Sequence, residues 1–227
     1  MLLTAFIYEE KVLERNIATR RERIQKASRH RREQEKKELR QTILKTAGEL
    51  FLEQGYDRFS MRRLAEEIGY SAATLYLYFR DKDDLLFTVV DEGFTRFEKQ
   101  LIEAAASSAD PWTRLNALAQ AYVTFGLRNP IYYQLMFLQR VDFLIQARAG
   151  EQQPRLAALH VLQDAVQSAM DAGVMQPGDV ESYSDALWAM MHGIVALAMS
   201  MPMFDAERLQ KLTAVAREMI FKAFSRE

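Results

Sequence analysis

Three helix starts lie within the 27 residues from Ser60 to Leu86, and this spacing constrains the fold more than any other part of the chain. Each start has a residue whose side-chain oxygen can cap a helix N-terminus: Ser60, Ser71 and Asp81. Gly69 follows the first apolar stretch, at a position where a left-handed residue commonly ends a helix. The pattern predicts a short helix, a tight turn, a second short helix and a longer third helix, as in a helix-turn-helix motif.

The second of these helices, expected over about Ala72 to Phe79, is too short to be stable in water by itself. Leu75 and Phe79 lie four residues apart and are expected to pack it against its neighbours. The outward residues include no carboxylate; they are Ala72, Ala73, Thr74, Tyr76 and Leu77. Small residues permit close approach to a base edge, and hydroxyl groups can bind phosphates. We therefore expect this helix to enter the major groove of DNA, with the Lys82 cation beside the next helix start.

Residues 41–86 resemble the DNA-binding domain of the TetR family of transcriptional regulators. The resemblance rests on three motifs: an A-x-x-L-F-x-x-x-G-Y helix end from Ala47, an S-x-R-x-L-A helix from Ser60, and T-L-Y-x-Y-F-x-D-K from Thr74. It implies base contacts by Ala72 and Ala73. It implies contacts to the DNA backbone by Ser60, Arg62, Thr74, Tyr76, Tyr78 and Lys82, and we add Ser71 and Leu77 to the predicted DNA-binding set.

This segment departs from the family pattern at two positions. Ala73 stands where glycine is usual, and Leu77 stands where a polar residue is common. Both changes alter the surface that would contact bases, so the operator sequence stays open.

The charge of the chain is unevenly distributed. Residues 1–80 hold 17 Lys and Arg against 12 Asp and Glu, whereas residues 81–227 hold 13 against 19. A basic N-terminal third suits a protein that binds a polyanion through that part. The chain has no cysteine and therefore no disulfide framework, which is compatible with the cytoplasmic location that we expect.

Glycine and proline are sparse, and no stretch shows the alternation typical of a strand. We predict an all-α protein of about nine helices, with breaks at Pro111, Pro130, Gly173 and Pro202. The expected division is an N-terminal extension over residues 1–36, a helix-turn-helix domain over 37–86, and a larger helical bundle over 87–227 for ligand binding and dimerisation.

The N-terminal extension is basic: residues 20–40 hold ten Lys and Arg among four Glu. Its polarity favours a solvated, partly disordered tail. The alternative is a helical continuation of the first domain helix, acting as a basic arm that adds phosphate or minor-groove contacts. Residues 1–8 are apolar but too short to span a membrane, and they lack the basic flank of a signal peptide.

Between Ala186 and Met199 the only polar side chain is His192. A helix that is apolar on every side is expected to be buried all round, here by its own domain and by a second copy of the chain. The residues predicted for this dimer interface are Leu187, Met191, Ile194, Val195 and Ala198. A membrane span is disfavoured because Asp185 and Asp205 flank the stretch and no basic residue adjoins it.

Trp188, His192 and Gly193 in this helix resemble the C-terminal domain of one TetR subfamily with a W-x-x-x-H-G motif. The resemblance implies that this helix and the last one pair with their counterparts in a homodimer. Two-fold symmetry would then present two recognition helices to the half-sites of a near-palindromic operator.

A ligand pocket in the larger domain is suggested by its aromatic residues and methionines. The predicted pocket residues are Tyr122, Phe125, Tyr133, Met136, Phe137, Trp188 and His192. Such side chains at helical spacing are more often ordinary core, and for His192 a hydrogen bond to a backbone carbonyl is the favoured alternative. The family resemblance implies a small-molecule effector, whose identity the sequence leaves open.

Enzymatic function is not expected. The three histidines are far apart, no helix carries a metal-binding pair, and neither a phosphate-binding loop nor a nucleophile elbow is present. We therefore predict no catalytic residue, no metal and no cofactor. The predicted function is a ligand-released repressor that binds DNA as a dimer; the alternative is a dimeric helical interaction protein without specific DNA binding.

Overall fold

The computed structural model describes residues 2–138 and 154–226, with side chains described from residue 25 onward and, after the gap, from residue 157. Within these ranges the regular structure is nine α-helices and one π-helical turn, and an isolated β-bridge joins Met175 to Ser225. The prediction of an all-α fold is confirmed. No helix of the described part is both long enough and apolar enough to cross a membrane.

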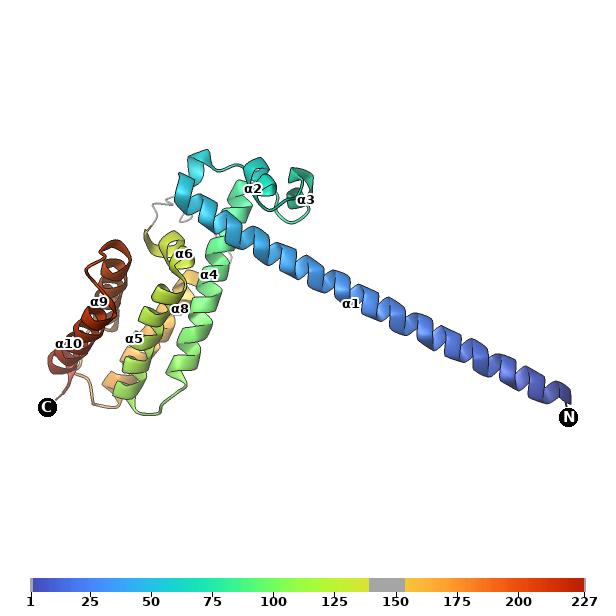
Figure 1. Cartoon of the computed structure of the whole chain (residues 1–227). Coiled ribbons are helices and arrows are strands. Elements are labelled where there is room, and N and C mark those ends of the chain that lie inside the picture. The colour runs from blue at the N-terminus through green and yellow to red at the C-terminus, as the bar shows by residue number, and fades with distance from the viewer. Residues whose placement is uncertain (1, 139–153, 227) are drawn as a thin grey trace.

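The N-terminal domain consists of the end of α1 (Leu2–Arg58), α2 (Met61–Glu67) and α3 (Ala72–Tyr76), which lie together at one end of the molecule (Figure 1). Gly55 interrupts α1 with a φ of 76°, a conformation that favours glycine because it has no Cβ. The domain core is formed by buried apolar residues of the three helices and of the segments that follow α1 and α3: Ile43, Leu44, Ala47, Leu50, Phe51, Phe59, Met61, Leu64, Ala65, Leu75 and Phe79.

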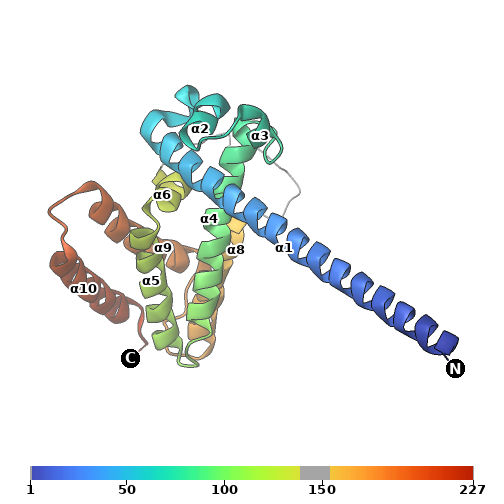
Figure 2. The same cartoon turned by 45° about the vertical axis from the view of Figure 1, so that its right-hand side comes forward.

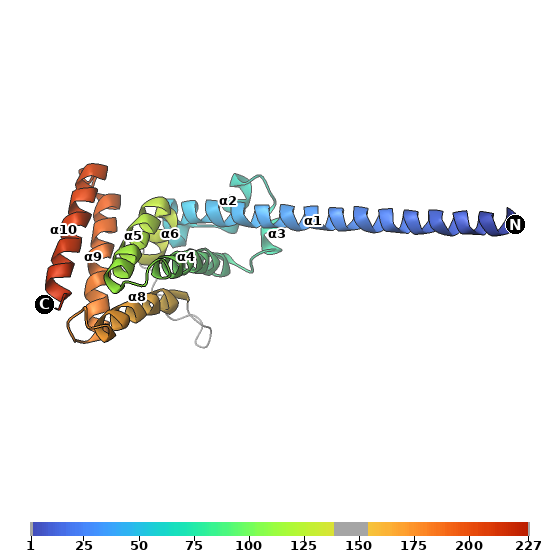
Figure 3. The ribbon, with the colours of Figure 1, turned by 90° about the horizontal axis from the view of Figure 1, so that it is seen from below.

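The first part of α1 projects away from the rest of the molecule as a straight helix (Figure 3). The side chains of residues 25–38 are exposed, apart from a half-buried Ser28. Of the two sequence-based alternatives for the extension, the structure has the helical one. The physical reason is that no proline or glycine precedes Gly48, so nothing in the chain stops the helix that the domain core fixes further on.

The C-terminal domain is a bundle in which α4 (Lys82–Ala105), α5 (Pro111–Arg128) and α8 (Pro154–Asp171) pack against one another. Between α5 and the gap lie the short α6 (Pro130–Tyr133) and the π-helical turn η1 (Gln134–Leu138). The last two helices, α9 (Val180–Ser200) and α10 (Ala206–Phe224), lie on one side of this bundle, with α10 outermost (Figure 2). The sequence predicts a further helix after the break at Pro130, over residues 131–146, and its part after Leu138 lies outside the described residues.

Helix α4 belongs to both domains. Its N-terminal half packs against α1, where Val89 lies beside Gly48, and its C-terminal half packs against α5 and α8. The boundary expected after Leu86 therefore falls inside one continuous helix of 24 residues. Helix α4 therefore connects the N-terminal domain, which contains α3, to the interior of the C-terminal domain.

Candidate functional site

The three predicted helix caps are present in the structure. The Ser60 hydroxyl accepts a hydrogen bond from the backbone N–H of Arg63 at 3.2 Å, and the Ser71 hydroxyl accepts one from Thr74 at 3.1 Å. The Asp81 carboxylate accepts one from the N–H of Asp84 at 2.8 Å. Gly69 has a φ of 74°, as expected for the residue that ends α2. These local interactions fix a helix-turn-helix in which α3 is presented at the surface.

Helix α3 is held by its inward face. Leu75 is completely buried and Phe79 nearly so, as the sequence predicted. The helix nevertheless ends at Tyr76, three residues earlier than expected. Its backbone tightens there, because the N–H groups of Leu77 and Tyr78 bond to carbonyls three residues back. Phe79 still reaches the core from this final turn.

The outward face of α3 combines small and hydroxyl-bearing side chains. Ala73 is exposed, Tyr76 is 53% exposed and Leu77 is 81% exposed. Ala72, Thr74 and Tyr78 are half-buried around them, and the hydroxyls of Ser71 and Thr74 lie 2.9 Å apart. Leu77, which directly follows α3, is too exposed to support the core of its own chain, so this face is available to a partner.

Two predicted DNA-binding cations have partners within the chain. Exposed Arg62 pairs with Glu66 at 3.1 Å, a contact that solvent screening makes weak. Lys82 is half-buried; its ammonium donates to the Tyr56 carbonyl at 3.3 Å and lies 4.0 Å from the centroid of the Tyr56 ring. Lys82 therefore holds the start of α4 against the end of α1, and a phosphate contact by this residue stays a prediction.

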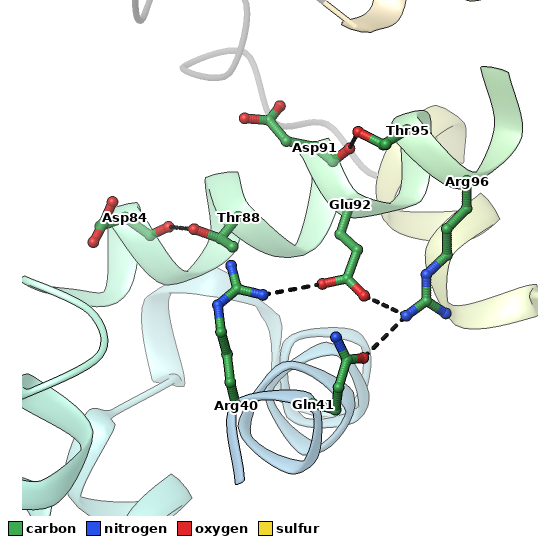
Figure 4. Close-up of polar contacts among 8 residues, drawn as sticks. All are labelled: Arg40, Gln41, Asp84, Thr88, Asp91, Glu92, Thr95 and Arg96. Atoms are coloured by element: carbon green, nitrogen blue, oxygen red, sulfur yellow. Dashed lines mark hydrogen bonds and ion pairs between the residues drawn. The ribbon is translucent and has the colours of Figure 1, made fainter. Parts of the chain in front are cut away.

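A polar clamp of Arg40, Gln41, Glu92 and Arg96 joins α1 to α4 (Figure 4). Arg40 lies 3.5 Å from a Glu92 carboxylate oxygen, and Arg96 binds the other oxygen of the same carboxylate. Arg96 also donates to the Gln41 side-chain oxygen at 3.0 Å. Since Glu92 is largely buried and shared by two guanidinium groups, it fixes the relative position of the two helices.

The C-terminal domain contains a cavity of about 330 Å³ between α4, α5, η1, α8 and α9. Four of the seven predicted pocket residues line it: Tyr122, Met136, Phe137 and Trp188. The prediction missed eight lining residues: Phe94, Phe97, Leu101, Leu118, Ala158, Leu159, Leu162 and Met191. These are apolar residues at ordinary helical spacing, so the sequence carries no signal that separates them from the core. Among the described lining residues none is charged.

The other three predicted residues lie behind the cavity wall. Phe125 is buried against Phe97, with 4.9 Å between the ring centroids. Tyr133 is completely buried, and its hydroxyl lies 2.6 Å from Nδ1 of His192. His192 thus bonds to a side chain, and the backbone-carbonyl partner that we favoured for it was wrong.

These residues form a hydrogen-bonded chain, here called the tyrosine–histidine network: Trp188, Tyr122, Tyr133 and His192. The Trp188 indole donates to the Tyr122 hydroxyl at 2.9 Å, and the two tyrosine hydroxyls lie 3.1 Å apart. Burial lowers the pKa of His192, which favours the neutral ring, and the Tyr133 hydroxyl and Nδ1 of this ring share one hydrogen bond. Burial raises the pKa of Tyr122 to about 12 and that of Tyr133 as well, so both hydroxyls remain protonated donors.

The residues predicted for the dimer interface on α9 point into their own chain. Leu187, Met191, Ile194 and Val195 are buried within their own chain, and Ala198 is half-buried. A Cβ added to Gly126 of α5 would lie 2.5 Å from Val195, which shows how closely this face packs on α5. The cause is that a helix apolar on all sides gives no indication of which side faces its own core. The exposed large apolar residues of α9 and α10 are Trp188, Val215, Met219 and Phe221. Exposed alanines accompany them: Ala186, Ala189, Ala206, Ala214 and Ala223.

The fold and the exposed α3 define a helix-turn-helix protein with a larger helical C-terminal domain. Residues 43–89 match the family model described as bacterial regulatory proteins of the tetR family, and residues 115–220 match the tetracyclin repressor-like C-terminal domain. The chain therefore belongs to the TetR family, and it is a DNA-binding transcriptional regulator of the helix-turn-helix class. This family and these relatives are transcriptional regulators rather than enzymes. The W-x-x-x-H-G subfamily assignment stays a prediction.

Known proteins resemble the two domains to different extents. An HTH-type transcriptional regulator of Staphylococcus aureus is 43% identical over 63 residues, which are 28% of this chain and 34% of that protein. The match thus spans about a third of the length of the curated relatives. A solved protein of unknown function from Rhodococcus sp. RHA1 has 28% identity and a TM-score of 0.67, covering 83% of this chain and 95% of that one. A TetR family regulator from Marinobacter aquaeolei VT8 shares the fold, with 17% identity, a TM-score of 0.66 and coverage of 86% and 100%.

Proposed function

We propose that this protein is a cytoplasmic repressor that binds a near-palindromic operator as a homodimer and is released from it by a small-molecule ligand. The observation that carries the proposal is the position of α4. This helix supplies Phe94 and Phe97 to the cavity wall and holds α1 through Glu92, so one element touches both the ligand cavity and the DNA-binding domain.

In the DNA-bound dimer, each α3 enters a major groove by its N-terminal end. Ala72 and Ala73 face base edges, and the hydroxyls of Ser60, Ser71 and Thr74 bind phosphates together with Tyr76 and Tyr78. Arg62 exchanges its weak surface pair with Glu66 for a phosphate. Leu77 offers an apolar contact to a thymine methyl, since its side chain is 81% exposed beside these residues.

The homodimer forms through the outer faces of α9 and α10. Val215, Met219 and Phe221 of α10 are each about half exposed or more, although they are large apolar residues. Exposed apolar side chains on adjacent helices are typical of a surface that a second copy covers. Burying them would also bring two α3 helices into one symmetric particle, as successive half-sites require.

Coupling between ligand and DNA runs through the contact of η1 with α4. Met136 lines the cavity, and a Cβ added to Gly93 would lie 2.7 Å from its sulfur, so the two elements touch with little space between them. Gly93 adjoins Glu92 of the polar clamp. A ligand that displaces Met136 moves α4 at this point, changes the position of α1, and disfavours the spacing that the operator requires.

The cavity chemistry points to an uncharged, largely apolar ligand. The wall is formed mainly by Phe, Leu and Met side chains, and among the described lining residues its polar groups are the Tyr122 hydroxyl and the Trp188 indole. A charged ligand would lose hydration without gaining a partner of opposite charge there. One neutral polar group on the ligand is accommodated if it bonds to Tyr122 or Trp188.

Selection of sites from random duplex DNA at stated salt tests the DNA-binding part. We expect an inverted repeat to be enriched, and substitution of Ala73 should change the preferred sequence. Enrichment of no sequence would favour the second candidate, a dimeric interaction protein without specific DNA binding.

The ligand-release part is tested on the selected duplex with a panel of neutral aromatic and aliphatic compounds. A compound that lowers DNA affinity should stop doing so in Ala158→Phe, which fills part of the cavity from the α8 side. Retained DNA binding by the variant shows that it folds. Compounds that bind but leave operator affinity unchanged would contradict release by ligand.

A further inference from the structure

We propose that the extension of α1 carries a second DNA-binding surface, which contacts phosphates of the duplex beside the site occupied by α3. The surface is here called the basic face and consists of Arg29, Arg32, Lys36 and Arg40. This inference does not depend on the operator sequence or on a ligand. It rests on the register of the helix, its exposure and its contacts with the N-terminal domain.

The helical register places these four cations together. They are separated by three, four and four residues, which on an α-helix is the spacing of one face. With a rise of about 1.5 Å per residue, the face extends over about 16 Å. Glu35 and Glu38 point to other sides of the helix at this register, and Glu33 lies at the edge of the face beside Arg29. The face therefore carries four cations against one carboxylate.

Contacts with the residues that follow α3 fix the direction of this face. The Lys36 ammonium lies 5.9 Å from the centroid of the Tyr78 ring, and the Arg40 guanidinium lies 5.7 Å from that of Phe79. The basic face therefore begins at the exit of the recognition helix and continues outward along the projecting part of α1 (Figure 1). A duplex held against α3 and Tyr78 lies next to Lys36.

Of the four cations, Arg40 also has a structural role, because it belongs to the polar clamp through Glu92. The other three lie on the exposed part of the helix. The side chains of residues 29–38 are exposed, so they support no core of the described chain. The helix is supported locally by pairs four residues apart, among them Arg29 with Glu33 at 3.2 Å and Arg31 with Glu35 at 3.5 Å. Such exposed pairs are weak, and Arg29 can exchange Glu33 for a phosphate at small cost.

Duplex DNA is the partner that fits these charges. It carries about one negative charge per 1.7 Å of axis, a density that a row of cations on a rigid helix can follow over several phosphates. The contacts would be independent of sequence, since they involve the backbone only. They add affinity outside the base-reading contacts of α3 and leave its preference unchanged.

The test compares two double variants with the same loss of charge. Arg32→Gln/Lys36→Gln removes two cations of the basic face, and Arg31→Gln/Lys37→Gln removes two that point elsewhere on the same helix. Glutamine keeps a high helix propensity, and circular dichroism checks that the helix is retained. Both are measured by fluorescence anisotropy on a random-sequence duplex of about 40 bp over a series of salt concentrations, long enough for two half-sites with flanks.

We expect the basic-face variant to bind about tenfold more weakly near 0.1 M salt and to reduce the slope of log K against log salt by about 1.8 per protomer, or 0.9 for each lost contact. The matched control should change this slope by less than about 0.45, which is half of the change expected for one lost contact. Equal losses in both variants would mean a diffuse charge effect and would overturn the proposal. No loss in either would overturn it as well, and would leave the face to an acidic protein partner.

Discussion

The N-terminal and C-terminal domains differ in where their functional side chains lie relative to the core. At α3 the residues proposed to bind DNA lie on the side opposite to the buried one. Leu75 is buried in the core, whereas Leu77, directly after the helix, is exposed. In the C-terminal domain, Tyr122 and Tyr133 are part of the core and of the cavity region at once. Function and stability are thus separable in the first domain and coupled in the second, and four substitutions or titrations probe this difference.

The largest effect is expected for Leu75→Ala. This side chain is completely buried and anchors a helix of five residues, so its loss should lower the free energy of unfolding by about 2–5 kcal/mol. Denaturant unfolding measures the change. Leu77→Ala is the matched control, since the same side chain is removed from the exposed face, and it should change stability by less than about 0.5 kcal/mol. Equal losses would show that both faces of α3 support the fold.

A smaller loss is expected for Tyr133→Phe in the tyrosine–histidine network. Removal of the hydroxyl leaves Nδ1 of His192 without its hydrogen-bond partner at 2.6 Å and should cost about 1–3 kcal/mol of unfolding free energy. Because the ring packing is retained, the loss reports the hydrogen bonds alone. Tyr132→Phe, outside the network, serves as the control and should leave stability nearly unchanged. If Tyr133→Phe also leaves the unfolding free energy unchanged, the polar groups near the cavity do not contribute to stability. That result would contradict the coupling of function and stability in the C-terminal domain.

The pH dependence of stability tests the contribution of His192 in the same network. Burial lowers the pKa of His192 in the folded state below its ordinary value of 6.5, so the unfolded chain binds the proton more readily. The stabilising effect is complete above pH 6.5 and decreases as the pH falls from 6.5 toward the lowered pKa. Melting temperatures between about pH 8 and pH 5 should therefore fall more in the unaltered protein than in His192→Gln. Parallel curves of melting temperature against pH for the two proteins would mean that the His192 ring does not contribute to the pH dependence of stability.

The smallest effect on stability is expected for Tyr76→Ala, since this side chain is 53% exposed; the change should be within about 0.5 kcal/mol. Affinity for all duplexes should nevertheless fall by a similar factor, about tenfold for one lost bond to a phosphate. Fluorescence anisotropy measures the affinity for the selected duplex and for the random duplex. The neighbouring exposed Tyr70 provides a control in Tyr70→Ala. A change of preferred sequence with Tyr76→Ala would show that α3 is rotated relative to the proposed orientation.

Local signals explain how much of the N-terminal domain could be predicted. The caps at Ser60, Ser71 and Asp81 act within three residues, so their effect can be read from the adjacent sequence. The early end of α3 was missed because it depends on how the exit loop reaches Phe79 and the start of α4. That geometry is set by packing between helices.

The C-terminal domain was less predictable because its features come from helices that are distant in sequence. The cavity joins residues of α4 and α8 whose apolar spacing is the same as that of any core. The interface residues on α9 were misplaced for a related reason: with apolar residues on all sides, the helix does not reveal its rotation. The burial of Val195 against Gly126 is decided by α5, about 70 residues earlier.

The continuity of α4 has a consequence for protein engineering. A chimaera made by joining a foreign DNA-binding domain after Leu86 would cut this helix and separate Val89 from the α1 surface near Gly48 on which it packs. A junction that keeps the helix whole together with its packing on the transferred α1 has to lie beyond Ala105, and it then carries Phe94 and Phe97 of the cavity wall with the transferred domain. In such chimaeras, operator preference and ligand preference would be inherited together.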